Sequence, residues 1–185
     1  MSSFLYINPI GENIDYFVFD AKKNIQEHHT IISNDISISF PQKIAELSKK
    51  YTLSEVWCIE GPGPFTKMRI VILCLNTLKY IYPTIHLKGC HFFDLIGQIS
   101  SKIPLLKANR KEFLIQENGS SIFYQKENLP KYEYIGYIGN EDSIDTFTKY
   151  KDSVDTVFTV FESLENKSRF SPIYIKKPHI TCPKK

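Results

Sequence analysis

Ten residues, Gly61 to Ile70, have the composition of a turn that could bind an anion. They read G-P-G-P-F-T-K-M-R-I and lie between a strand-like run, residues 56–60, and an apolar helix predicted over residues 67–82. Glycine permits backbone angles that other residues avoid, and Thr66 is the predicted N-cap because its hydroxyl can accept from a first-turn N–H. A glycine-rich strand-to-helix turn can hold an anion on the helix N-terminus. Neither G-x-x-x-x-G-K-[ST] nor G-x-G-x-x-G occurs here, so the local chemistry favours a structural turn.

The other residues that could bind a metal or act in catalysis are scattered. His28 and His29 are adjacent and His86 and His91 are five residues apart, whereas a helical site such as H-E-x-x-H needs two histidines four residues apart. No serine or cysteine has the sequence context of a nucleophile. The four cysteines, Cys58, Cys74, Cys90 and Cys182, include no C-x-x-C pair. Their spacing predicts free thiols in a reducing cytoplasm, and the whole pattern predicts no catalytic residue, no metal and no cofactor.

Net charge and hydropathy exclude few classes of protein. The 185-residue chain has a net charge of +3, which is too small to predict nucleic-acid binding by itself. Two basic pairs, Lys176-Lys177 and Lys184-Lys185, could contact RNA phosphates, but a solubilising tail is the simpler interpretation. Polar residues interrupt the helix predicted over 67–82 well short of the ~18 apolar residues of a membrane span, and the first residues lack the features of a signal peptide. We therefore expect a cytoplasmic protein that does not enter a membrane.

Strand and helix patterns predict an α/β protein of two lobes. The first lobe, residues 1–100, has the predicted order βββαβαβα, with strands at 4–7, 15–19, 25–32, 54–59 and 85–87 and helices at 41–51, 67–82 and 91–100. The second lobe, residues 101–185, opens with strands at 103–107, 112–116, 121–125 and 132–137, followed by helices at 142–150 and 154–164 and a last strand at 172–175. This order fits a duplicated α/β lobe better than one doubly wound sheet.

Three segments match motifs of one family. Gly61, Pro62, Gly63, Phe65, Thr66, Arg69 and Ile70 fit the pattern G-P-G-S-F-T-G-L-R-I. In the second lobe, Ala108, Arg110 and Glu112 match a strand motif L-D-A-R-R-G-E-V-Y, and residues 172–178 fit P-x-Y-L-R-x-P. These motifs resemble the TsaB (YeaZ) family, whose members support synthesis of threonylcarbamoyladenosine on tRNA. The resemblance covers most of the chain, and it implies a two-lobed actin-like (ASKHA) fold with a reduced second lobe.

The first strand departs from the family pattern. Family members carry Asp-Thr-Ser where this chain has Asn8, Pro9 and Ile10. In active actin-like proteins that acid helps to hold a metal–phosphate unit, whereas Asn8 is neutral and the next two residues lack hydroxyls. The resemblance therefore implies a non-catalytic scaffold that holds the TsaD-type enzyme in a competent arrangement during threonylcarbamoyl transfer to tRNA. The alternatives are a small actin-like ATP-binding phosphotransferase, which Asn8 argues against, and an RNA-binding module, which the net charge argues against.

The helix predicted over 67–82 is apolar nearly all round, so more than one of its sides must be covered. In TsaB-like proteins this helix and the one before it, here 41–51, form the face that pairs with TsaD or with a second copy. We expect tRNA to be contacted only indirectly. Residues at three- and four-residue steps share one face, and they predict a partner interface of Arg69, Ile72, Leu73, Asn76, Lys79 and Tyr80. The opposite side, with Ile70, Cys74 and Ile81, is expected to pack on the chain's own sheet, and the turn residues Gly61, Pro62, Gly63, Phe65 and Thr66 are expected to be structural.

Overall fold

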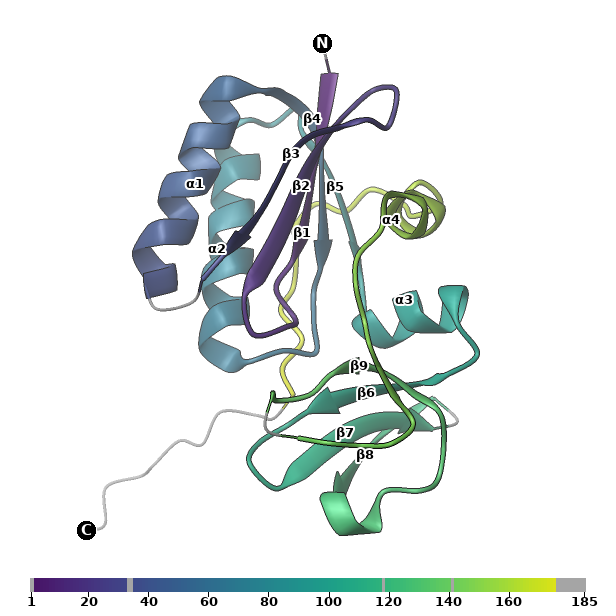
Figure 1. Cartoon of the computed structure of the whole chain (residues 1–185). Helices are drawn as coiled ribbons and strands as arrows, with labels where there is room; N and C mark the ends of the chain where they lie inside the picture. The colour runs from purple at the N-terminus through teal and green to yellow at the C-terminus, as the bar shows by residue number, and fades with distance from the viewer. Residues whose placement is uncertain (1, 33–34, 118, 141, 176–185) are drawn as a thin grey trace, which may run out of the picture.

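Each of the two lobes is built on a five-stranded sheet (Figure 1). The structure is a computed structural model that describes residues 2–32, 35–117, 119–140 and 142–175. The first lobe contains β1 (Ser2–Asn8), β2 (Ile14–Asp20), β3 (Ile25–Ile31), α1 (Ile36–Lys50), β4 (Thr52–Ile59), α2 (Phe65–Ile81), β5 (His86–Cys90) and α3 (Phe92–Ile99). The second sheet and its connections contain β6 (Ile103–Lys107), β7 (Glu112–Glu117), β8 (Ser120–Gln125), the 3₁₀ helix η2 (Lys126–Asn128), β9 (Tyr134–Tyr137), β10 (Phe147–Lys149) and α4 (Val154–Phe161). The predicted order βββαβαβα of the first lobe is confirmed.

The two sheets repeat one strand order. The first runs β3-β2-β1-β4-β5 and the second runs β8-β7-β6-β9-β10. In each sheet the three leading strands pair antiparallel and the last two strands join in parallel. Parallel neighbours need a crossover connection, and α1 and α2 supply the two crossovers of the first lobe. In the second lobe the corresponding connections are η2 and a loop whose described residues form no helix. The second lobe is therefore reduced by the loss of its two crossover helices.

Helices cover both faces of the first sheet (Figure 1). α1 and α2 pack side by side on one face, and their buried residues include Phe40, Ile44, Leu47, Val71 and Leu75. α4 follows the second sheet in the chain but returns to the opposite face of the first sheet. There the rings of Phe158 and Phe161 lie 4.9 Å and 5.6 Å from the ring of Trp57. Burying one such side chain stabilises the fold by roughly 1.5–3 kcal/mol, so α4 ties the end of the second lobe to the core of the first.

Two predicted helices differ from the observed elements. α1 begins at Ile36 rather than at residue 41, because Ile36 and Phe40 extend its buried stripe by a turn, and Pro41 lies inside the helix. The helix predicted over 142–150 is wrong. That stretch contains β10, which pairs in parallel with β9 and extends the second sheet at its edge. Backbone pairing with an existing strand has overridden the local helical pattern there.

Residues 167–175, here called the return segment, run from α4 back toward β5 and the turn before α2 (Figure 1). The Lys167 N–H donates to the Leu87 carbonyl of β5 at 2.8 Å, and the Lys167 ammonium pairs with the carboxylate of Glu60. The other Glu60 oxygen accepts from the Ser171 N–H at 2.7 Å. The Glu60 side chain is only 4% exposed, and a buried carboxylate must be paired to offset its lost hydration. Glu60 therefore fixes the return segment on the first lobe.

The turn after β4 is held by the backbone of the return segment. The Ile173 N–H donates to the Glu60 carbonyl at 2.7 Å, and the Gly63 N–H donates to the Ile173 carbonyl at 3.2 Å. The Ile175 N–H then donates to the Gly63 carbonyl at 3.3 Å. Residues 172–175 thus lie beside the turn, joined to it by an isolated bridge, and do not form the predicted strand. Because the chain itself occupies the Gly63 N–H, the structural interpretation of the turn is favoured over anion binding.

α2 begins at Phe65, one residue before Thr66. Pro64 occupies the N-cap with φ −60° and ψ 130° and makes no side-chain cap bond. Its carbonyl accepts from the Met68 N–H at 2.9 Å and so closes the first turn. The predicted N-cap role of Thr66 is therefore wrong, because Thr66 lies inside the first turn with its side chain exposed. The ring of Phe65 lies 4.6 Å from the ring of Tyr174 in the return segment.

The two glycines of the turn should respond differently to alanine. Gly61 has φ +130°, and a Cβ there would run into the carbonyl oxygen of Ile173. Gly63 does not have a left-handed backbone, and its Cβ would meet the Met68 sulfur at 2.7 Å, at the flexible end of a side chain. We expect Gly61→Ala to lower the free energy of unfolding by about 2 kcal/mol or more. Gly63→Ala should change it by no more than about 1 kcal/mol. Urea unfolding of both variants tests this, and equal losses would contradict the assignment.

Candidate functional site

The two lobes are joined at Asn8, the last residue of β1. Its Nδ2 donates to the Tyr137 hydroxyl of β9 at 2.9 Å and to Asp152 Oδ2 at 2.7 Å. Its Oδ1 accepts from the Ile10 N–H at 3.0 Å, and the Tyr6 hydroxyl donates to Asp152 Oδ1 at 2.6 Å. We call Tyr6, Asn8, Tyr137 and Asp152 the interlobe network. It connects the first strand to the second sheet and to the segment before α4.

In the interlobe network Tyr6 and Asn8 are buried and Tyr137 and Asp152 are half-buried, and this burial shifts the pKa values of its titratable groups. Burial raises the pKa of the Asp152 carboxyl above its ordinary value, while the hydrogen bonds from Tyr6 and Asn8 act in the opposite direction. Burial, and after it the Asp152 carboxylate, also raise the pKa of Tyr6 and of Tyr137. Both hydroxyls therefore stay protonated at neutral pH. A network of this kind is stabilising only when every member has its partner, which makes it sensitive to a change of charge.

The interlobe network does not fit a metal–phosphate unit. Asn8 stands where the TsaB pattern has an acid, and its amide uses both hydrogens and its oxygen within the protein. Ile10 is 5% exposed and presents no hydroxyl. Hard cations such as Mg²⁺ need carboxylate or other oxygen ligands with free lone pairs. Across the described ranges, no group of three His, Cys, Asp or Glu side chains could hold a metal ion.

Lys67 fixes the neighbouring turn between β1 and β2. It lies in the first turn of α2, where the TsaB motif has glycine, and it is 7% exposed. Its ammonium donates to the Gly11 carbonyl and, at 3.0 Å, to the Glu12 carbonyl. Burial lowers the pKa of Lys67 to about 8. The two carbonyls compensate only part of the hydration that the charge has lost, and the lysine holds the turn against the start of α2.

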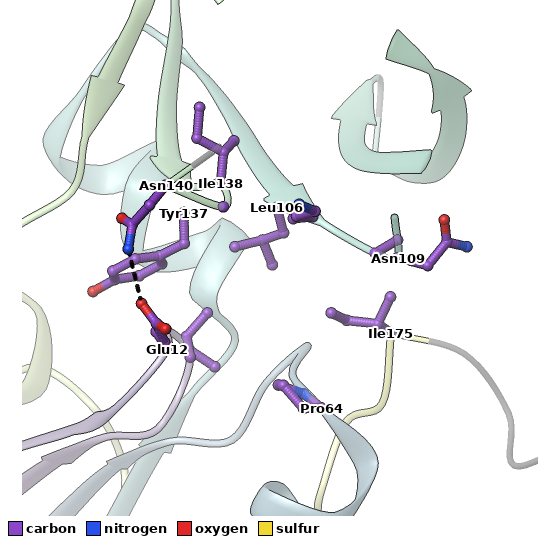
Figure 2. A pocket seen from close by; sticks show the side chains of 13 residues that line it. Glu12, Pro64, Leu106, Asn109, Tyr137, Ile138, Asn140 and Ile175 are labelled. Atoms are coloured by element: carbon purple, nitrogen blue, oxygen red, sulfur yellow. Dashed lines mark hydrogen bonds between the residues drawn. The ribbon is translucent and has the colours of Figure 1, made fainter. Parts of the chain in front are cut away.

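An open cleft of about 390 Å³ lies between the lobes beside the interlobe network (Figure 2). The first lobe contributes Glu12 and Pro64, the second contributes Asn109, Tyr137 and Asn140, and the return segment contributes Ile175. Asn140 Nδ2 donates to Glu12 Oε2 at 3.4 Å across the cleft. Lys107, which also lines it, pairs with Asp142 at 2.7 Å. The cleft thus combines one exposed carboxylate with two amides around an apolar floor.

His91 and His28, for which the sequence predicted no metal, contact a backbone N–H and an aromatic ring. His91 is the N-cap of α3, where its Nδ1 accepts from the Phe93 N–H at 3.2 Å. The His28 ring stacks on Phe17 at 4.1 Å. Cys58, Cys74 and Cys90 carry free thiols, whereas Cys182 and the basic pairs Lys176-Lys177 and Lys184-Lys185 lie outside the described residues. No described helix has the length and apolar content to cross a membrane.

A second hollow is an apolar groove of about 510 Å³ between α1 and α2. α1 contributes Pro41 and Ala45 among others, and α2 contributes Ile70, Leu73, Cys74 and Ile81. Leu73 is 65% exposed and Ile81 is 59% exposed. Exposed apolar residues that line one groove are typical of a protein-binding surface. We call this surface the helix groove.

Three of the six residues predicted to form a partner interface on α2 make contacts within the chain, and the interface itself stays a prediction. Ile72 is 3% exposed and packs in the core. Asn76 exchanges two hydrogen bonds with the backbone of Phe170, at 3.0 Å and 2.8 Å, under the return segment. The Lys79 ammonium donates to the carbonyls of Pro83 and Ile85 at 2.6 Å and 2.7 Å. These three side chains therefore make their main contacts within the chain.

The other three residues of the predicted interface are exposed. Leu73 lines the helix groove, whereas Arg69 and Tyr80 are exposed outside it. Ile70, Cys74 and Ile81 were expected to pack on the sheet. All three line the helix groove, and Ile70 and Cys74 also pack against the core, whereas Ile81 is 59% exposed. The free apolar side of α2 thus faces away from the return segment.

No protein-family model matches the sequence, and no curated protein matches it. Solved structures do match it. YeaZ from Pseudomonas aeruginosa superposes with a TM-score of 0.53 at 13% identity, over 73% of this chain and 76% of that chain. The chain has a YeaZ-like fold. A second structure, described as an uncharacterised protein similar to the peptidase YeaZ from Pseudomonas aeruginosa, gives a TM-score of 0.52 at 13% identity, over 74% of this chain and 75% of that chain.

The two-lobed actin-like fold predicted from the sequence is therefore confirmed. The interlobe cleft and the helix groove are the two candidate functional surfaces of this YeaZ-like fold. Sequence analysis identified Asn8 but missed its partners Tyr137 and Asp152. No sequence signal would have found them, because they lie 129 and 144 positions away in the chain and belong to no motif.

Asn8→Asp tests the interlobe network by placing a second carboxylate against Asp152. Two carboxylates at this distance cannot both ionise, so one folded-state pKa rises far above its unfolded value. A carboxyl with a raised folded pKa destabilises the fold as pH rises through the window between the two values. We expect Asn8→Asp to lose on the order of 3 kcal/mol between pH 4 and pH 7 relative to the unchanged protein.

Asn8→Ala is the matched control, because it removes the amide without adding charge. Its loss of stability should also grow with pH, because the Asp152 carboxyl loses one hydrogen bond that lowers its pKa, but by clearly less than the loss in Asn8→Asp, which adds a second carboxylate. Urea unfolding at several pH values measures both variants. Parallel pH profiles for Asn8→Asp and Asn8→Ala would contradict the assigned contact between Asn8 and Asp152.

Proposed function

We propose that this protein is a TsaB-type, non-catalytic partner of a TsaD-like enzyme in the biosynthesis of threonylcarbamoyladenosine on tRNA. The proposal combines the YeaZ-like fold with the motif at Gly61 to Ile70. The reaction would belong to the partner enzyme, and this chain would hold it in a competent arrangement. The protein would act in the cytoplasm without a cofactor, as a heterodimer with the enzyme or as a homodimer.

The observation that carries the proposal is the helix groove. α2 has more apolar surface than its own chain covers, and the uncovered part forms one groove with α1. Burying apolar surface is favourable at roughly 25 cal/mol per Å², which favours a partner that fills the groove. Small residues, Pro41 and Ala45 on α1 and Cys74 and Thr77 on α2, line it. Their size would let another helix approach closely, as in helix-in-groove recognition.

The state of the interlobe region supports a non-catalytic role. In an actin-like enzyme this region would hold the nucleotide and its metal. Here Asn8 is fully bonded within the protein, and Lys67 is committed to the carbonyls of the β1–β2 turn. The surfaces that remain are suited to binding rather than to proton transfer or phosphoryl transfer.

A peptidase is not favoured, although one related structure carries that word in its description. A peptidase needs a nucleophile beside a base, or a metal. The histidine contacts at His91 and His28 are with a backbone N–H and an aromatic ring. Within the described ranges there is no cluster of side chains that could hold a metal ion.

The alternative function is a small actin-like ATP-binding phosphotransferase, with the nucleotide in the interlobe cleft. Calorimetry with ATP and Mg²⁺ separates it from the scaffold. We expect no binding in the micromolar range, because Asn8 offers no free oxygen ligand and Glu12 would repel phosphate. A dissociation constant near 1 μM, which corresponds to about −8 kcal/mol, would overturn the scaffold proposal.

A pair of substitutions on α2 tests the helix groove. Leu73→Asp adds a charge inside the groove, and Tyr80→Asp adds the same charge at an 85% exposed position outside it. Both positions are exposed, so both variants should stay folded by circular dichroism. We expect Leu73→Asp to weaken association with the TsaD-like protein, or with a second copy, by about thirtyfold or more, or ~2 kcal/mol. Tyr80→Asp should have little effect.

Sedimentation and co-purification with the TsaD-like protein measure this association. Equal behaviour of Leu73→Asp and Tyr80→Asp would place the partner face elsewhere. Ile72→Asp is a third variant with a different expected result. It should unfold the protein, because Ile72 is buried in the core and an unpaired buried charge is costly.

A further inference from the structure

The interlobe cleft contains a carboxylate that has no ion-pair partner in the described chain. The charged side chains of its lining are Glu12 and Lys107. The Lys107 ammonium is paired with Asp142 at 2.7 Å. Within the described chain Glu12 forms no ion pair, and its carboxylate accepts one hydrogen bond, from Asn140 Nδ2 at 3.4 Å. That distance exceeds the usual range of about 2.7–3.2 Å for an N–H donor and an oxygen acceptor. The Glu12 carboxylate can therefore accept a stronger, charged donor.

The backbone around Glu12 is fixed, although the Glu12 side chain is exposed. The Lys67 ammonium attracts the Glu12 charge, but it donates to the carbonyls of Gly11 and Glu12 rather than to the carboxylate. The Tyr137 ring packs on the same turn, because a Cβ on Gly11 would lie 3.0 Å from Tyr137 Cε1. The Tyr137 hydroxyl in turn accepts from Asn8. The acidic end of the cleft is thus preformed, which lowers the entropy cost of binding a ligand there.

The cleft changes from polar to apolar along its length. Figure 2 shows Glu12, Asn140 and the Tyr137 ring together at one end of it. Leu106 and Ile175 lie toward the other end. Leu106 is only 2% exposed, and the Ile175 backbone is bonded to the turn before α2. A ligand that fits both ends carries a positive charge on an apolar body.

We propose that the interlobe cleft binds a small organic amine. Its ammonium would donate to the Glu12 carboxylate and to the side-chain oxygen of Asn140, beside the Tyr137 ring, whose π face attracts cations. Its apolar body would lie against Leu106 and Ile175. The volume of about 390 Å³ lies within the range of roughly 300–1,000 Å³ of small-molecule sites. The inference concerns a different surface from the helix groove and does not rest on the proposed function.

Other classes of ligand fit the cleft less well. The Glu12 charge repels anions, phosphates among them. A neutral apolar molecule would remove water from the carboxylate without replacing its hydrogen bonds. A bare divalent cation needs several oxygen ligands, and no described cluster of His, Cys, Asp or Glu side chains could hold one. An organic ammonium needs few acceptors and uses the apolar end of the cleft as well.

The test is a nuclear magnetic resonance titration of the full ¹⁵N-labelled chain with three probes of similar shape. They are phenethylammonium, the neutral 2-phenylethanol and the anionic 3-phenylpropionate. Hydrogen bonds to charged groups are stronger than those between neutral groups. We therefore expect the amine to bind at least about tenfold more tightly than the alcohol, and the acid to bind more weakly than either. The backbone amides of Gly11, Glu12 and Asn140 should shift on binding of the amine.

Two matched variants locate the charge that is recognised. Glu12→Gln removes the carboxylate from the cleft and keeps the shape of the side chain. Glu165→Gln makes the same change at an exposed position that does not line the cleft. Because both positions are exposed, both variants should fold. We expect Glu12→Gln to weaken binding of phenethylammonium by about tenfold and to remove its advantage over the alcohol, whereas Glu165→Gln should leave both unchanged.

Four results would overturn the inference. They are absence of amine binding at millimolar concentration, equal affinities for the amine and the alcohol, equal losses in the two glutamate variants, and binding of spermidine as tight as that of phenethylammonium. The last result would show a general attraction of cations that does not use the apolar end. Leu73→Asp, which changes the helix groove, should leave amine binding intact, and its loss in that variant would contradict a separate site.

Discussion

The packing of the first lobe depends on which sides of α2 are buried and by which elements. This helix is apolar nearly all round, and water-exposed apolar surface is costly. The first sheet and α1 bury Met68, Val71 and Leu75, and the return segment takes a further side through its two bonds to Asn76. The buried pair of Glu60 and Lys167 holds the return segment in place. The helix groove remains uncovered, so the contacts that hold the return segment, with the pair of Glu60 and Lys167 among them, help to set which side of α2 stays exposed.

The interlobe network gives the second lobe its position. In nucleotide-binding actin-like proteins a bound ligand can bridge the lobes, whereas here Asn8, Tyr137 and Asp152 bridge them directly. α4 adds an apolar tie by packing Phe158 and Phe161 against Trp57. The second lobe is thus held to the first by the chain's own side chains.

Sequence patterns predicted the order of strands and helices well, but they predicted poorly which side chains of α2 are exposed. The strand and helix order of the first lobe follows from local patterns, and the turn motif at Gly61 pointed to the family of folds. The buried side of α2 could not be predicted from local patterns. Helical periodicity shows that Ile70 and Ile72 lie on different faces, but it does not show which face meets the sheet. Ile72 is buried in the core, and Asn76, one turn later, bonds to Phe170, which lies 94 positions further along the chain. Likewise, Asn8 was identified as a departure from the family pattern, but its contact with Asp152 depends on the tertiary structure.

Hydrogen exchange of the full chain, alone and with the TsaD-like protein of its own cell, tests the central claim most directly. Backbone amides of helices are protected further when a partner covers them. The account predicts added protection in residues 37–49 and 70–82, which border the helix groove, and little change at residues 9–12 and 137–140 around the interlobe cleft. Protection at the cleft with none at the groove would contradict it.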